Sequence, residues 1–514
     1  MSDISTPEVA SRGRYRSACA EIWPLIALAA AIFGVLMVCS HRYGFHRDEF
    51  YIRESGRHLA WGYPDHPPLS PLLARIADEI APDSLVALRI PAMLAAAVTI
   101  LLVGLIAREF GGDRRAQLLA SAIAGSSILV LASGHILSTA TLDVAFATAL
   151  VFLVARLMRT GDQRLWAVAG IVLGLGLLNR VFLAVYAAMM LAALISTGPR
   201  EVLRGKWLPI GVVLAVVIAA PTIVWQARNG WPQWQMATEI SADNSRWELL
   251  AFQLVIIGPL LLPVWLAGLW WLLKRDVRCF GVAFLALLGL LLITSGQQHY
   301  LVAAYPPVLA AAGIAASQWL AGSARRFRAI ALSTVLAVSA AIAAVFALPV
   351  LPVSMLANTP VVDVNGELGE QIGWPEMGRT VAEIVDRLPA TETVVVADNY
   401  GQAGAIAQFG PDFSTRTMPF PPVYSGHQAY AWWGPPPERY TTAVVMGTDA
   451  PSRVPAWAEQ ACGRLTEVTA VHNDHGIDNQ ENGTRVFLCQ NLTASWTDLW
   501  PTIRRIGPAD LPES

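Results

Sequence analysis

Charged side chains are scarce in this sequence of 514 residues, because Asp, Glu, Lys and Arg together make up 14% of it. A soluble globular protein usually carries about 25% of these residues. Hydrophobic residues make up 54%, and the mean hydropathy is +0.47. The composition therefore excludes a large soluble enzyme. The net charge of −2 also gives no sign of the excess of basic residues that nucleic acid attracts, so we expect no nucleic-acid partner.

Several signatures of well-known catalysts are also lacking. The sequence contains no glycine-rich phosphate-binding loop, no Cys/His spacing typical of zinc and no Gly-x-Ser-x-Gly elbow. The run His472–His475 has two imidazoles, but it lies among Asn, Asp and Gly residues and is interpreted as a solvated turn.

Cysteine is rare as well, with five residues in the whole chain. Cys19, Cys39 and Cys279 lie in or beside apolar runs, where we expect small buried side chains. Cys462 and Cys489 lie in the polar C-terminal part and are a candidate disulfide pair if that part is outside the cytoplasm.

Long apolar runs are what the sequence does have, at roughly the 17–25 residues that a bilayer core requires. The fifth and sixth runs share only the short stretch Leu165–Thr197, but a single crossing there would place the flanking basic connections on opposite sides. We therefore predict eleven spans, at 22–40, 86–107, 116–134, 142–158, 165–179, 181–197, 207–225, 249–273, 279–295, 300–320 and 328–349.

Basic residues alternate between the connections and predict the orientation. Cytoplasmic connections carry an excess of Lys and Arg, and here every second connection is short and holds three of them. The N-terminus is therefore predicted to be cytoplasmic, and everything after about residue 350 extracytoplasmic. The basic groups are Arg12, Arg14 and Arg16; Arg108, Arg114 and Arg115; Arg156, Arg159 and Arg164; Arg200, Arg204 and Lys206; Lys274, Arg275 and Arg278; and Arg325, Arg326 and Arg328.

Two parts of the chain follow from this pattern. Residues 1–349 are predicted to form a polytopic α-helical membrane domain whose first outer loop spans 41–85, and residues 350–514 a soluble α/β domain. In the second part, the short β-branched runs 393–397, 442–446 and 485–488 predict strands. The spacing of apolar residues over 381–388 predicts a helix.

The first outer loop is dense in ionisable residues, and Asp48 and Glu49 follow the first span closely. At the membrane surface, a carboxylate can take the proton of an attacking hydroxyl or help to hold a divalent ion. The same two residues could simply cap an interfacial helix that runs to about Trp61. Tyr51 lies in this predicted helix.

Further polar residues lie at other outer connections. Asp65-His66-Pro67-Pro68 is typical of a turn and a helix start, and His66 could bind phosphate or metal or lie at the interface. Asp143, at the mouth of the fourth span, is either functional or an N-cap with its Ser and Thr neighbours. Arg180 could hold a phosphate or extend to the interface.

Two more outer segments could either bind substrate or lie at the membrane interface. Gln297, Gln298, His299 and Tyr300 precede the tenth span, where tyrosine could equally belong to an interfacial aromatic belt. The segment 225–247 contains four tryptophans, for which interfacial anchoring is favoured over stacking on a sugar.

The order of these pieces resembles the family 39 type of membrane glycosyltransferases, which includes protein O-mannosyltransferases and the bacterial aminoarabinose transferase of lipid A. The stretches that carry the resemblance are HRDEFYIRESGRHLAWGYPDHPPLSPLLAR, GHILSTATLDVAF, NGWPQWQ and HYLVAAYPPVLAAAGIA, with ADNYGQAGAI and PPVYSGHQAYAWWGPP in the C-terminal part. The resemblance covers nearly the whole chain. It implies the GT-C fold, with an active site in the outer loops and a sugar donor on a polyprenyl phosphate.

The resemblance also implies roles. Asp48 matches the family's Asp-Glu motif as general base or acceptor-orienting group, supported by Glu49, and Asp143 matches its second carboxylate. An alternative in which Asp48 and Asp143 hold a divalent cation stays open. Asp65 and His66 stand where relatives have Glu-Lys.

The expected binding of the donor phosphate departs from the relatives. His66 replaces a lysine, and Gln297 stands about where a lysine is common. Phosphate binding is therefore expected from Arg180, His66, His299, Tyr300 and Gln297.

The resulting prediction is a multi-pass glycosyltransferase of the inner (plasma) membrane. It would move a sugar from a polyprenyl phosphate to a hydroxyl of a lipid, glycan or protein acceptor on the extracytoplasmic face. A transporter and a lipid-linked glycan flippase or ligase are the alternatives. A transporter would place ionisable residues near the middle of spans and repeat its two halves. Here the ionisable residues gather at one face.

Overall fold

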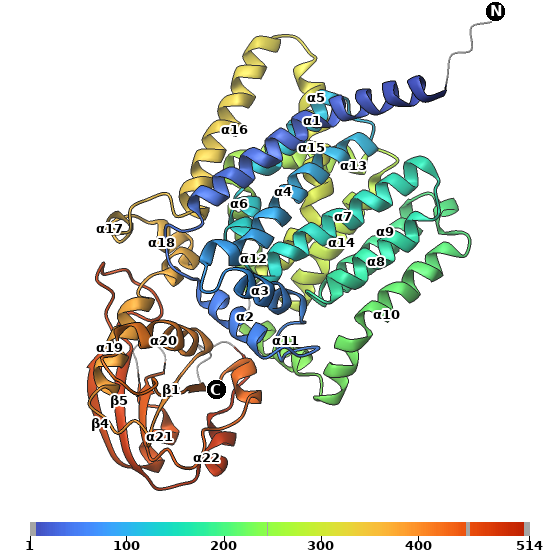
Figure 1. Ribbon diagram of the computed structural model, residues 1–514. Helices are drawn as coiled ribbons and strands as arrows, with labels where there is room; N and C mark the ends of the chain where they lie inside the picture. Colours follow the sequence, from blue (N-terminus) through green and yellow to red (C-terminus); the bar gives the residue numbers. More distant parts are fainter. Residues whose placement is uncertain (1–6, 244, 449–452, 508–514) are drawn as a thin grey trace, which may run out of the picture.

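The computed structural model describes the backbone of residues 7–243, 245–448 and 453–507, and the side chains of the same residues apart from 7–21 and 239–243. A bundle of helices, α1 to α16, precedes a small sheet covered by helices (Figure 1). The sheet region lies beside the end of the bundle where α2 (Arg47–Arg57), α3 (Leu69–Ile80) and α11 (Pro232–Asp243) are found (Figure 1).

The helices of the bundle confirm a multi-pass membrane protein. Among the described residues, six segments are long and apolar enough to cross a membrane, and up to eight if each of two bent pairs counts as one span. The six are Ile22–Cys39 within α1 (Pro7–Cys39), α4 (Leu85–Glu109), α7 (Thr139–Thr160), α10 (Trp207–Arg228), Gln298–Leu320, which joins η3 (Gln298–Ala304) to α15 (Tyr305–Leu320), and α16 (Arg325–Ala347).

The other predicted spans correspond to bent or short helices. One bent pair is α5 (Arg114–Gly125) with α6 (Ile128–His135), at 59°. The other is α12 (Arg246–Ile257) with η2 (Pro259–Leu261) and α13 (Leu262–Leu273), at 87°. The shorter apolar helices are α8 (Leu165–Leu177), α9 (Leu183–Thr197) and α14 (Arg278–Thr294). Each predicted span thus has a helix or a bent pair at its place, while eleven as the number of crossings stays a prediction.

The two bends differ from the continuous spans that the apolar runs suggest. In the first, Ser127 is extended, with φ −90° and ψ 147°, so the chain leaves the helix inside an apolar run. In the second, Gly258 takes φ 105°, a left-handed value that favours glycine, and Pro259 follows it. The apolar composition of these runs does not predict either break.

Contacts between connections gather the basic residues at one end of the bundle. Glu109, at the end of α4, pairs with Arg156 and Arg159 at the end of α7. Gln163 donates a hydrogen bond to the carbonyl of Glu201 in η1 (Arg200–Leu203). These contacts agree with the predicted grouping. The side chains of Arg12, Arg14 and Arg16 lie outside the described residues.

The first outer loop forms two helices at the opposite end. α2 (Arg47–Arg57) is shorter than the predicted helix to Trp61, and its N-cap is His46 rather than Asp48 or Glu49. α3 (Leu69–Ile80) begins directly after Pro68, as predicted. The exposed face of α3 carries Leu72, Ile76 and Ile80, one turn apart, which suits a helix lying in a membrane surface.

The C-terminal unit, residues 350–507, starts with short helices and contains a five-stranded sheet of order β2-β1-β3-β5-β4. β1 pairs in parallel with β2 and β3, and β5 pairs antiparallel with β3 and β4. The helices are α17 (Val353–Leu356), α18 (Val361–Val364), η4 (Gly366–Gln371), α19 (Trp374–Val385), α20 (Tyr400–Phe413), η5 (Gln428–Trp432), α21 (Ala456–Ala461) and α22 (Trp496–Ile503). The strands are β1 (Thr393–Ala397), β2 (Val423–Ser425), β3 (Thr442–Met446), β4 (Cys462–Ala470) and β5 (Arg485–Leu492).

The predicted strands 393–397 and 442–446 are confirmed, and the third extends four residues further than 485–488. The predicted helix 381–388 was placed too late, since α19 ends at Val385 and most of it precedes the predicted start. A disulfide joins Cys462 to Cys489, on the neighbouring strands β4 and β5.

The C-terminal unit packs directly on α2. The ring of Phe50 lies 5.5 Å from that of Trp374 in α19 and 6.1 Å from that of Phe409 in α20, both edge to face. Phe50, Tyr51 and Ile52 belong to one buried cluster with residues of α19, α20 and the sheet. The first outer loop is therefore held between the bundle and the sheet, while a domain boundary at 349–350 stays a prediction.

Candidate functional site

A cavity of about 580 Å³ lies where α2, the bundle and the C-terminal unit meet. Its wall combines segments that are far apart in the sequence: α2, the turn around Asp65, the start of α7, the connection between α8 and α9, the region from α10 to α11, and parts of the C-terminal unit. Its polar lining residues include Asp48, Tyr51, Asp65, His66, Arg180 and Gln297, all of them predicted site residues.

Asp48 projects from the first turn of α2. Its carboxylate is 38% exposed, which leaves it accessible from the cavity. Oδ1 accepts a 2.8 Å hydrogen bond from the hydroxyl of Tyr400 in α20, and Oδ2 lies 4.0 Å from Nδ1 of His46. This placement gives the cavity a carboxylate within reach of a substrate hydroxyl, as a general base requires.

Glu49 does not share this cavity. Its side chain is buried, and Oε2 accepts a 2.9 Å hydrogen bond from the backbone N–H of His46 in a capping box. Nε of Arg89 donates to Oε1 at 2.9 Å, and Nη2 of Arg89 donates to Oε2 at 2.7 Å. The N–H of Leu137 also donates to Oε1. Glu49 therefore helps to cap α2 from the third position of the helix, and it forms a buried ion pair with Arg89.

Tyr51, Asp65 and His66 form one polar group on the wall. The hydroxyl of Tyr51 donates a 2.6 Å hydrogen bond to Asp65 and accepts one from the N–H of Ala429. Burial raises the pKa of Asp65. Nδ1 of His66 lies 3.0 Å from the carbonyl oxygen of Pro67, whereas Nε2 has no hydrogen-bond partner among the described residues. It lies 3.9 Å from Oδ1 of Asp65, which is beyond hydrogen-bond distance.

Arg180 supplies a cation on the wall formed by the connection between α8 and α9. Nη2 of Arg180 lies 2.6 Å from Nε2 of His299, and its guanidinium carbon is 4.9 Å from the ring centre of Tyr300. Tyr300 also stacks on Phe182 at 4.2 Å. Within the described part of the chain, no carboxylate lies within 4.0 Å of Arg180. Its charge therefore remains available to an anion.

The residues around Arg180 divide into lining and supporting groups. Gln297 and Tyr300 line the cavity with Arg180, while His299 contacts Arg180 from outside the lining. Asn179, which precedes Arg180, is buried and donates to the carbonyl of Thr139 at 2.7 Å. The connection is thereby tied to the start of α7.

Asp143 lies inside α7 rather than at its N-cap, which is Ser138. Its side chain is buried, it does not line the cavity, and Oδ1 has no hydrogen-bond partner in the described residues. Arg180 is the charged residue that acts on it electrostatically. The structure therefore places Asp143 behind the wall, near the cation.

No group of three His, Cys, Asp or Glu side chains in the described residues is arranged to hold a metal ion. Asp48 lines the cavity and Asp143 does not, and the alternative in which the two hold a cation stays a prediction.

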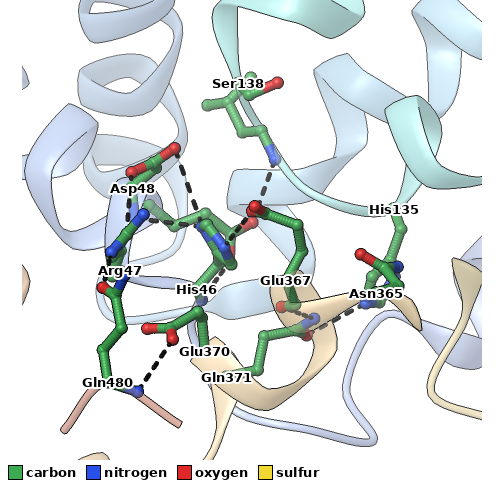
Figure 2. A network of polar contacts seen from close by, with 12 residues as sticks. His46, Arg47, Asp48, His135, Ser138, Asn365, Glu367, Glu370, Gln371 and Gln480 are labelled. Carbon is green, nitrogen blue, oxygen red and sulfur yellow. Dashed lines mark hydrogen bonds and ion pairs between the residues drawn. The ribbon is translucent and has the colours of Figure 1, made fainter. Parts of the chain in front are cut away.

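A second polar network lies next to Asp48 and reaches into η4 (Figure 2). His46 is fully buried, and its Nε2 lies 2.8 Å from Oε2 of Glu367. Burial alone would lower the pKa of His46, but attraction to Glu367 and Asp48 outweighs burial and raises this pKa. The contact with His46 lowers the pKa of Glu367 to about 2. The N-cap of α2 is thus tied to the start of the C-terminal unit.

Known proteins share this architecture. Residues 65–225 match the model of the family described as dolichyl-phosphate-mannose-protein mannosyltransferase. ArnT from Cupriavidus metallidurans, solved bound to undecaprenyl phosphate and in the apo state, is similar with a TM-score of 0.58 in both cases. The identities are 16% and 15%, and both matches cover 92% of this chain and 98% of ArnT.

The chain has the GT-C fold. Arabinofuranosyltransferase AftD from Mycobacteria is also similar, with a TM-score of 0.51 and 15% identity over 91% of this chain and 40% of AftD. No curated protein matches the sequence significantly. The fold expected from the order of the motifs is thereby confirmed.

The C-terminal unit supplies a part of the cavity wall that the sequence does not predict. Tyr400 and Gln428 line the cavity, and they lie in the stretches ADNYGQAGAI and SGHQAY. Those stretches stand out in the sequence, but nothing in them indicates contact with Asp48. Trp231 and Trp234 also line the cavity, although interfacial anchoring was favoured for them.

Proposed function

We propose that this protein is a membrane glycosyltransferase that moves a sugar from a polyprenyl-phosphate donor to an acceptor hydroxyl on the extracytoplasmic face. One observation carries the proposal: a single cavity has the accessible carboxylate of Asp48 on one wall and the guanidinium of Arg180 on another. A base and an anion-binding cation are what this transfer needs. The fold shared with ArnT, which was solved with undecaprenyl phosphate, supports the same donor class.

The donor phosphate is assigned to the wall around Arg180. A polyprenyl-phosphate sugar is a phosphodiester with one negative charge, which one guanidinium can neutralise through two parallel hydrogen bonds. Tyr300 and His299 hold the guanidinium, and Gln297 adds an amide to the same wall.

The leaving group gains a second negative charge as its bond to the sugar breaks. His66 presents a buried Nε2 without a hydrogen-bond partner among the described residues. We assign this nitrogen to the developing phosphate charge, where interactions that strengthen in the transition state accelerate the reaction.

The transfer itself needs one base. The acceptor hydroxyl oxygen attacks the anomeric carbon and forms the new glycosidic bond, while the bond from that carbon to the phosphate oxygen breaks. The hydroxyl proton passes to Asp48, and the electron pair of the broken bond leaves with the polyprenyl phosphate. Asp48 supplies this base because its carboxylate faces the cavity and Oδ2 is not engaged by Tyr400.

We assign Asp143 to the donor side. Its buried carboxylate acts electrostatically on Arg180, so it keeps the guanidinium in place without contacting the substrate. Arg180 has no carboxylate within 4.0 Å in the described residues, and it therefore still presents its charge to the phosphate.

The site is proposed to face outward from the inner (plasma) membrane. The basic connections lie at the end of the bundle away from the cavity, which suits a cytoplasmic location for that end. The Cys462–Cys489 disulfide suits an oxidising compartment for the C-terminal unit. Both arguments give the same orientation.

A transporter is less well supported. We considered the six long spans and the side chains described in them. There, each ionisable residue lies within about two turns of a helix end, as Arg89, Asp143 and Arg156 do. A substrate path through the membrane would instead need such residues near the middle.

The proposal is tested by replacing Asp48 with Asn and measuring transfer in membranes from radiolabelled undecaprenyl-phosphate hexose and pentose donors. Loss of a general base lowers the rate by about 10²–10⁴-fold. Asp363→Asn is the matched control, because Asp363 is an exposed carboxylate of the C-terminal unit away from the cavity. Full activity in the Asp48→Asn variant, at equal protein levels, contradicts the proposal.

A second experiment identifies the donor. Mass analysis of polyprenyl lipids in a strain that lacks the gene should find one sugar-carrying polyprenyl phosphate accumulating. The transporter is favoured instead by two results together. The polyprenyl lipids of the strain are unchanged, and the purified protein in proteoliposomes passes a solute.

A further inference from the structure

Tyr400 is the point at which the C-terminal unit reaches the proposed base. It is the first residue of α20, directly after the N-cap Asn399. Its hydroxyl donates a 2.8 Å hydrogen bond to Oδ1 of Asp48. Its ring is stacked between Tyr51, at 4.6 Å, and His427, at 4.9 Å. The hydrogen bond thus comes from a side chain that is packed on both faces.

The position of Tyr400 is set inside the C-terminal unit. Oδ1 of Asn399 accepts a 2.9 Å hydrogen bond from the N–H of Gln402, which closes the first turn of α20. The amide groups of Asn399 and Gln402 both donate to the carboxylate of Glu481, at 2.9 and 2.7 Å. All three side chains are buried. Such a fully bonded network fixes one arrangement of the helix start.

The hydrogen bond has a geometric consequence for Asp48. It holds Oδ1 on the wall, so that Oδ2 is the oxygen that can accept the substrate proton. Burial and the nearby charge of Asp48 raise the pKa of Tyr400 well above its ordinary value, so Tyr400 remains a donor at every physiological pH.

We propose that Tyr400 is a positioning residue for Asp48 and that the C-terminal unit therefore completes the active site. This inference rests on the proposed function of Asp48 as the base. It adds that the bundle does not form the working site alone, because Tyr400 lies 352 residues away in the sequence and belongs to the unit beside the bundle.

The test is Tyr400→Phe in the full-length protein, with kcat and the KM values for donor and acceptor measured per folded molecule. The ring and its stacking are kept, and only the hydroxyl is lost. Asp48 is then no longer held by the hydrogen bond, so kcat falls about tenfold while both KM values change little. In the Asp48→Asn background, Tyr400→Phe causes no further loss of kcat. Tyr424→Phe, in β2 and away from the cavity, is the matched control and leaves kcat unchanged.

The outcomes separate the two proposals. An inactive Asp48→Asn variant combined with an unchanged kcat of Tyr400→Phe overturns the positioning role and keeps the proposed function. An active Asp48→Asn variant overturns the proposed function itself. A merely structural role for Tyr400 lowers the amount of folded protein but leaves kcat per folded molecule unchanged, and this outcome also overturns the inference.

Discussion

The carboxylate of Glu49 lies 2.7 Å from the guanidinium of Arg89, and neither side chain is exposed to solvent. Asp48, the preceding residue, is 38% exposed and faces the cavity. Successive residues of an α-helix point about 100° apart, so two adjacent carboxylates can serve two purposes. Here one belongs to the cavity and the other joins α2 to α4.

The first prediction follows from this separation. Glu49→Ala leaves the buried guanidinium of Arg89 without its charge partner, which costs about 3–5 kcal/mol of unfolding free energy. The purified protein in detergent should therefore unfold at a lower temperature and be recovered in smaller amounts. The turnover per folded molecule should stay within a few-fold of the original.

Asp48→Asn is the matched comparison, with the opposite result: normal thermal stability and little transfer. A Glu49→Ala protein that is as stable as the original but loses turnover a hundredfold would show that Glu49 takes part in the chemistry after all.

The second prediction concerns Arg180, whose charge has no carboxylate within ion-pair distance among the described residues. Arg180→Ala should raise the KM for the lipid donor by about 10- to 100-fold, since a hydrogen bond to a charged group contributes about 1.5–3 kcal/mol. Arg180→Lys keeps the charge but loses the paired geometry, and it should recover only part of the loss.

The measurement for Arg180 is transfer at varied donor concentration with a fixed acceptor. Arg228→Ala is the control, because Arg228 ends α10, is exposed and does not line the cavity. If Arg180→Ala changed only the KM for the acceptor, the assignment of the donor phosphate to the wall around Arg180 would be contradicted.

The third prediction is a pH dependence of stability from the pair His46 and Glu367. The raised pKa of His46 stabilises the fold below the ordinary value of 6.5, and this contribution is lost as pH rises through the folded-state pKa. The pKa of Glu367, lowered to about 2, stabilises the fold above the ordinary value of 4.5, and this contribution is lost as pH falls towards 2. The pair therefore stabilises the fold fully between about pH 4.5 and 6.5, and less as pH rises through the raised pKa of His46.

Glu367→Gln should lower the unfolding temperature at about pH 6, and its effect should shrink as pH rises through the raised pKa of His46. The side chain of Glu367 is 60% exposed, so solvent screens the interaction and the expected loss is about 1 kcal/mol or less. Glu392→Gln, at an exposed position of the same unit, is the control. Equal losses at both pH values would contradict an ionic origin.

The membrane fold was largely predictable because the bilayer imposes a length and a hydropathy on each span, and both are visible in a single sequence. That Asp48, His66 and Arg180 lie together was predictable for a similar reason, because counting the spans between the basic connections places all three at the same end of the bundle. The breaks at Ser127 and Gly258 were not, because an apolar run continues through both.

The site was predictable only where local sequence carried a signal. Asp48 and Glu49 look equivalent in the sequence, and the contact with Arg89 that separates them depends on the packing of α2 against α4. Tyr400 and Gln428 reach the cavity through tertiary packing across hundreds of residues, for which neither periodicity nor spacing gives a sign.

The last prediction uses an unsatisfied group in the cavity wall. Gln428 is buried and lines the cavity, and its Oε1 has no hydrogen-bond partner among the described residues. Its backbone has φ 53°, a left-handed value that a residue other than glycine adopts at a cost. A buried acceptor without a donor also costs free energy. Both costs are understandable if a substrate hydroxyl donates to Oε1 during the reaction.

Gln428→Leu should therefore weaken binding without weakening the fold. Without substrate, the unfolding temperature should stay the same or rise, because an unsatisfied oxygen has been removed. The KM for either the sugar donor or the acceptor should rise about tenfold, as expected for one lost hydrogen bond of about 1.4 kcal/mol. Gln235→Leu, an exposed position of α11 outside the lining, should change neither quantity. Unchanged KM values for both substrates, or a clear loss of stability, would mean that Gln428 stabilises the cavity wall and does not bind the substrate.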